Sequence, residues 1–146
     1  MKRRLVFLAA CLLLATGACG SSNDKSPAAS TPTPAVFGQT CTAPKPAAKK
    51  LPKLPSGFPK PDAVTYTSGS KAGPSTILYG YYALDLTEAH TGWADALKGA
   101  GYTITHEEQD PADAEVNFSG DQITGQVRLQ ESCKGRSLVT VTIRPD

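Results

Sequence analysis

One short stretch of the chain places a histidine among several acids. His106, Glu107 and Glu108 are consecutive, and Asp110 and Asp113 follow shortly after. Imidazole nitrogens and carboxylate oxygens hold divalent cations and transfer protons, so this stretch is the candidate for metal or hydrolytic chemistry. A solvated acidic loop explains the same residues. No glycine-rich phosphate loop, G-x-S-x-G or H-E-x-x-H motif occurs. We therefore predict no catalytic residue, no metal ligand and no cofactor.

The first twenty residues are typical of an export signal. Residues 1–4 are basic at three positions, an uncharged apolar run follows from Leu5 to Ala15, and small residues lead to Cys19. The apolar run is well short of the ~20 residues that a transmembrane helix needs. We predict a signal peptide over residues 1–18, removed after export.

Cys19, with small residues before it and Gly20-Ser21 after it, resembles the lipobox of bacterial lipoproteins. Thr16 stands where that pattern usually has leucine. The resemblance implies that Cys19 carries acyl chains such as palmitate, and that the lipid bilayer holds the protein on the extracytoplasmic face of the cell membrane. An ordinary cut after Ala18, which would leave a free secreted protein, is the alternative.

The four cysteines are Cys11, Cys19, Cys41 and Cys133. Cys11 leaves with the signal and Cys19 accepts the lipid, so Cys41 and Cys133 remain as a pair in an oxidising compartment. No CxxC spacing supports a metal site. We predict a disulfide that closes almost the whole folded part, for which chain entropy gives ~4–5 kcal/mol at the upper end.

Nine of the twelve prolines lie between Pro27 and Pro61. Such composition predicts a disordered tether over residues 19–61, rich in proline, serine, threonine and lysine. Five lysines and no acid lie in its second part, at Lys45, Lys49, Lys50, Lys53 and Lys60. From Asp62 onward twelve acids face six bases. These lysines could contact anionic headgroups or anionic wall polymer. Alternatively, they keep a linker with few apolar residues soluble, or they lie across the acidic body of the same chain. This acidic body excludes nucleic acid as a partner.

Residues 62–146 have the pattern of a single α+β domain. Asp85 and Glu88 predict a capped helix that ends at Gly101. Its apolar stripe consists of Leu86, Ala89, Trp93, Leu97 and Ala100. Alternation predicts six strands at residues 63–67, 76–84, 102–106, 114–119, 122–130 and 138–143, with a tight turn at Gly120-Asp121. We expect the order ββαββββ, a two-layer antiparallel sheet with this one helix as its cover.

Several turns and core positions are similar to a recurring small secreted or lipid-anchored domain of high-GC Gram-positive bacteria. These are residues 54–59, 97–104, 118–120, Gly125 and 139–143. The resemblance implies the fold and the extracytoplasmic location, and it implies no activity.

Three tyrosines in one predicted strand are the best candidates for recognition. Tyr79 and Tyr81 share one face of the strand, whereas Tyr82 takes the other. A sheet face that shows tyrosine beside polar side chains suits sugars or peptides. Half-buried structural positions explain the same tyrosines.

These patterns favour a non-catalytic binding or accessory module of the cell envelope, anchored by lipid, with an envelope protein, a glycan or a small ligand as its partner. The alternative is an envelope hydrolase or metal-dependent enzyme that uses His106 and the nearby acids.

Overall fold

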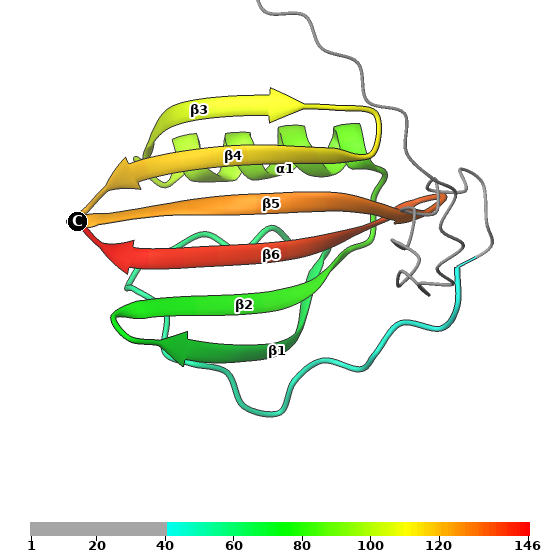
Figure 1. The fold of residues 1–146 in the computed structure, drawn as a ribbon, viewed down its shortest axis with the longest axis horizontal. Helices are drawn as coiled ribbons and strands as arrows, with labels where there is room; N and C mark the ends of the chain where they lie inside the picture. The colour runs from blue at the N-terminus through cyan, green and yellow to red at the C-terminus, as the bar shows by residue number, and fades with distance from the viewer. Residues whose placement is uncertain (1–40) are drawn as a thin grey trace, which may run out of the picture. The chain divides into compact units, whose positions relative to one another are not determined.

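Alternating apolar and polar residues build one antiparallel sheet. The computed structural model describes residues 41–146. The signal peptide, Cys19 and the first part of the tether lie outside these residues. The strands are β1 (Val64–Ala72), β2 (Ser75–Tyr82), β3 (Thr103–Gln109), β4 (Asp113–Gly120), β5 (Ile123–Cys133) and β6 (Arg136–Pro145). Their order in the sheet is β1-β2-β6-β5-β4-β3 (Figure 1). With one helix between β2 and β3, the predicted ββαββββ α+β fold is confirmed.

Helix α1 (Leu86–Gly99) begins where the sequence predicts. The backbone N–H of Glu88 donates to Asp85 Oδ1 at 3.0 Å, and Gly101 takes a φ of 88° after the last turn. The predicted stripe is buried except for Ala100, which is exposed. That expectation was wrong because Ala100 is the C-cap residue, beyond the last full turn, and Ala94 is buried instead.

The core lies between the sheet and a second layer that contains more than the helix. Phe58 is buried, and its ring lies 5.6 Å from Phe118 and 5.9 Å from Tyr102, measured between centroids. Leu51 and Leu54 pack against the same core. The folded part therefore begins ahead of the expected boundary at Asp62, and the helix is not the only cover of the sheet.

Residues 41–53, which we name the edge strap, run beside the outer edge of β1 (Figure 1). The backbone N–H of Ala48 donates to the carbonyl of Tyr66 at 2.9 Å, and Pro52 lies against Gly69. Prolines in the edge strap have no N–H to continue a ladder, so the segment covers an open sheet edge without becoming a strand. Local composition alone predicts disorder here, and contact with the sheet overrides it.

Gly92 interrupts the apolar helix for a packing reason. A Cβ built at Gly92 would lie 2.5 Å from the hydroxyl of Tyr82, which the sheet directs toward the helix. Glycine in a helix costs about 1 kcal/mol relative to alanine. The close approach of Tyr82 leaves no room for a Cβ, and this explains why glycine occurs at this helix position.

The β4–β5 hairpin turns at Asp121 and Gln122, one residue later than predicted. Both have positive φ, 51° and 60°, as a two-residue hairpin turn of the primed type requires. The glycine that suggested the turn, Gly120, ends β4 beside Tyr102.

Candidate functional site

The sheet face opposite the helix is open, and it carries the residues that could meet a ligand. Tyr79 is 43% exposed on this face, whereas Tyr82 is 4% exposed on the other. In the register, Tyr79 lies opposite Thr140 and Tyr81 lies opposite Leu138. Leu138 is 47% exposed. The expected split of the tyrosines is therefore confirmed, and Leu138 is an apolar neighbour that the sequence alone did not single out.

A groove of about 550 Å³ lies between the start of the edge strap and this open face. We name it the strapped groove. Residues 42–45 form one wall. The floor and the other wall come from β1, β2, β5 and β6, with Thr67, Tyr79, Tyr81, Gln130, Arg136 and Leu138 among the lining side chains.

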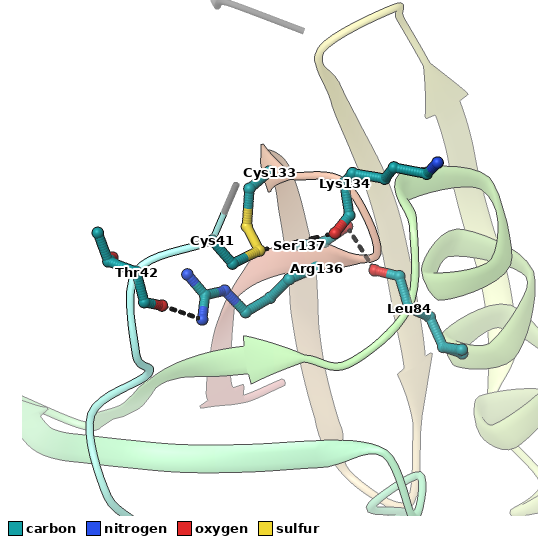
Figure 2. The surroundings of a disulfide bond; sticks show 7 residues. All are labelled: Cys41, Thr42, Leu84, Cys133, Lys134, Arg136 and Ser137. Atoms are coloured by element: carbon teal, nitrogen blue, oxygen red, sulfur yellow. Dashed lines mark hydrogen bonds between the residues drawn. A yellow bond between two sulfur atoms is a disulfide. The ribbon is translucent and has the colours of Figure 1, made fainter. Parts of the chain in front are cut away.

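Two interactions hold the wall in place, and both start at the β5–β6 hairpin. Cys41 is bonded to Cys133, with 5.4 Å between their Cα atoms, so the predicted disulfide is present. The Arg136 guanidinium donates to the carbonyl of Thr42 at 2.8 Å and lies 5.9 Å from the centre of the Tyr81 ring. Figure 2 shows the disulfide and the contact of Arg136 with Thr42 together at the hairpin. The strap is thus fixed at the groove by one covalent and one polar contact.

The hairpin is itself tied to the rest of the fold. The buried hydroxyl of Ser137 donates to the carbonyl of Leu84 at 3.3 Å (Figure 2). Leu84 belongs to the connection from β2 to α1. This bond joins the start of β6 to that connection.

The chemistry of the strapped groove favours binding. The described residues that line it include no aspartate, glutamate, histidine or cysteine. They include two cations, Lys45 and Arg136, together with hydroxyl and amide groups. Such a lining offers aromatic area, hydrogen bonds and positive charge, but no group that transfers protons near neutral pH. It suits a neutral or acidic ligand with an apolar side.

A second, more polar hollow of about 360 Å³ lies on the same face and includes His106. Asn117, Gln126, Thr142 and Arg144 are among its other lining residues. In the register, His106 lies opposite Asn117, Asn117 opposite Gln126, and Gln126 opposite Thr142. The result is a row of hydrogen-bonding side chains across four strands, which extends the polar surface next to the groove.

The structure separates the side chains of residues 106–113, the candidate stretch for metal or hydrolytic chemistry. A register shift between Ile104 and His106 leaves His106 and Glu108 on the open face, where His106 Nε2 lies 3.4 Å from Glu108 Oε2. Glu107 instead meets Lys98 of the helix, with 3.0 Å between Oε1 and Nζ. Within residues 41–146 no three side chains of His, Cys, Asp or Glu gather as metal ligands.

Asp113 takes part in a different contact from His106. Its carboxylate lies 3.5 Å from Arg128 Nη2, and Arg128 also approaches Glu115 at 3.9 Å. His90, on the helix, is half-buried and far along the chain from this stretch. The acids that lie close together in the sequence thus have different partners. Glu107 pairs with Lys98, Glu108 with His106, and Asp113 with Arg128.

Burial raises the pKa of three tyrosines, all on the core side. The pKa of Tyr66 rises strongly because its ring is buried. Burial and, less strongly, Asp62 raise the pKa of Tyr82, and burial and Asp121 do so for Tyr102. Each of these side chains packs in the core, so the shifts mark structural positions.

Over residues 41–146, no helix combines the length and the apolar character needed to cross a bilayer. Comparisons with protein-family models, with curated proteins and with solved structures find no match to this chain.

Proposed function

We propose that this protein is a lipid-anchored, extracytoplasmic module of the cell envelope that binds its ligand in the strapped groove without catalysing a reaction. The single observation that carries the proposal is the groove itself: exposed Tyr79 and Leu138 lie on an open sheet face beside a wall held by the disulfide.

The disulfide supports the location. Disulfides persist outside the reducing cytosol, and this one joins the two cysteines that remain after the predicted export signal and lipid site. The basic start and apolar run of residues 1–15, followed by Cys19, supply the other half of the argument. Secretion without lipid remains the alternative location.

The groove chemistry supports the ligand class. Aromatic and aliphatic side chains provide contact area at little cost in conformational entropy, and Gln130 and the nearby hydroxyls can fix orientation. Lys45 and Arg136 disfavour a cationic ligand. An envelope glycan or a neutral to acidic extended peptide has the required combination of apolar faces and hydrogen-bonding groups.

Solution NMR tests the proposal directly. Soluble fragments of purified cell-wall glycan and short neutral or acidic peptides are titrated into the protein while the ring resonances of Tyr79 and Tyr81 are followed. We expect shifts confined to the groove and a loss of affinity of about tenfold or more in Tyr79→Ala with Leu138→Ser, because interface aromatics often carry much of the binding energy.

The matched control is His106→Ala with Glu107→Ala, which changes two exposed residues outside the groove. Unchanged binding and an unchanged phenotype in this variant support the binding module. If this control abolishes the phenotype while the groove variant retains it, the envelope-hydrolase alternative replaces our proposal.

A further inference from the structure

Charge is divided between the two edges of the sheet. Residues 41–84, which form the edge strap, the segment after it, β1 and β2, contain six lysines and one acid. Residues 85–120, which form α1, β3 and β4, contain eight acids and one lysine. Because β1 and β3 are the two outer strands, the positive and negative charges lie at opposite ends of the sheet.

The lysines of the edge strap remain available at the surface. Lys45, Lys49, Lys50 and Lys53 are all exposed. Within residues 41–146 none of them forms an ion pair, and the described ion pairs involve Lys98, His106 and Arg128 instead. The charges of these lysines are therefore not neutralised by an ion pair within residues 41–146.

The fold arranges these lysines in a line. Ala48 and Pro52 contact β1, so Lys49 and Lys50 between them follow this sheet edge. Lys45 precedes them at the strapped groove, and Lys53 follows them beside Lys71. The two lysines Lys53 and Lys71 line the same shallow hollow. Contact with β1 thus turns a lysine-rich segment into a basic edge, by which we mean these five lysines.

We propose that the basic edge docks on the anionic headgroups of the membrane. Charge complementarity is the first argument, because a lysine close to an anionic surface contributes about a fivefold factor in binding. Continuity of the chain is the second. The strap is the part of the folded unit nearest in sequence to Cys19, so the same end of the molecule is brought to the bilayer when lipid is attached.

Docking by the basic edge orients the module. The acidic edge with β3 and β4 then points away from an anionic surface, which repels it. The open face stands upright between the two edges, so the strapped groove is accessible from the side. The arrangement uses acyl chains for attachment and lysines for orientation, two signals that act together.

Vesicle binding tests the proposal independently of any groove ligand. The full chain carrying Cys19→Ser, which has no lipid acceptor, is sedimented with vesicles of phosphatidylglycerol and phosphatidylcholine, and with phosphatidylcholine alone. We expect preference for the anionic vesicles, weakened by salt because exposed charges are screened. Lys49→Gln with Lys50→Gln should lower the partition coefficient by about 25-fold, which is a factor of about five for each lysine.

The matched control is Lys98→Gln with Arg128→Gln, which removes the same charge from exposed residues of α1 and β5, away from the basic edge. A loss of less than about twofold there supports a specific edge. Equal losses in both variants, or equal binding to both kinds of vesicle, would overturn the proposal. Binding to soluble anionic wall polymer with none to anionic vesicles would overturn it as well.

Discussion

Tyr66 illustrates how much a single buried polar atom can matter in this small fold. Its side chain is 3% exposed, and its hydroxyl has no hydrogen-bond partner within the described residues. A buried polar group without a partner costs about 1–3 kcal/mol in desolvation. The ring contributes apolar area to the core while the hydroxyl weakens it.

Replacing Tyr66 with phenylalanine should therefore stabilise the protein. We expect Tyr66→Phe to raise the free energy of unfolding by about 1 kcal/mol, measured by urea titration near neutral pH. The same change should also raise the pH at which the protein unfolds in alkaline solution. Burial raises the pKa of Tyr66 in the folded state, so the unfolded state loses this proton first. The stability that Tyr66 contributes is complete below pH ~10, the ordinary pKa of tyrosine, and it declines as pH rises above that value.

Unfolding at alkaline pH should thus begin at higher pH in Tyr66→Phe than in the parent. Tyr79→Phe is the control, because it removes the same hydroxyl from a side chain that is exposed on the open face. A Tyr66→Phe protein that is less stable than the parent would indicate that the hydroxyl has a bound partner in solution.

The edge strap is the element whose behaviour depends most on tertiary contacts. One backbone hydrogen bond, the Arg136 contact and the disulfide hold residues 41–48. None of these contacts is local in sequence. The strap is therefore the element most affected when one of them is removed.

Removing the disulfide should loosen the strap and destabilise the whole fold. We expect Cys41→Ala with Cys133→Ala to lower the free energy of unfolding by about 2–4 kcal/mol, because the bond closes most of the folded chain. Trypsin should then cleave after Lys49, in the edge strap, well before it cleaves within the sheet. Mass spectrometry of early fragments measures this order.

Arg136→Gln provides a comparison, since it removes the polar contact and keeps the covalent one. We expect slower cleavage after Lys49 in this variant than in the double cysteine variant. Equal cleavage of the parent and the double cysteine variant after Lys49 would mean that the disulfide does not hold the edge strap.

At the scale of the whole molecule, attachment and orientation have separate causes in our proposals. Cys19 attaches the protein through acyl chains, and the basic edge turns it on the surface. Two acyl chains hold a protein stably, whereas charge alone gives binding that salt reverses.

Cys19→Ser should therefore move the exported protein from the membrane fraction to the medium after a high-salt wash. Fractionation with an antibody measures the distribution, and the intact mass of the parent measures the attached lipid. A parent found in the medium, with a mass that starts after Ala18 and no lipid, would instead support the secreted alternative.

The amino-acid sequence determined the parts of this protein that depend on local pattern. Period-two alternation predicted the strands, and Asp85 with Glu88 predicted the start of the helix, because both signals act within a few residues. The placement of Tyr79 and Tyr82 on opposite faces follows from the same period. The disulfide was predictable because only two cysteines remained for it.

The tertiary structure decided the contacts between residues that are far apart in the sequence. It brought the proline-rich residues 41–53 against the edge of β1, where local composition predicts disorder, because burying Leu51, Leu54 and Phe58 offsets the entropy of ordering them. It also decided that His106, and not Glu107, lies on the open face, because the register shift between Ile104 and His106 moves the side chains after it to the other face. The strapped groove and the basic edge exist only because strands far apart in sequence lie side by side.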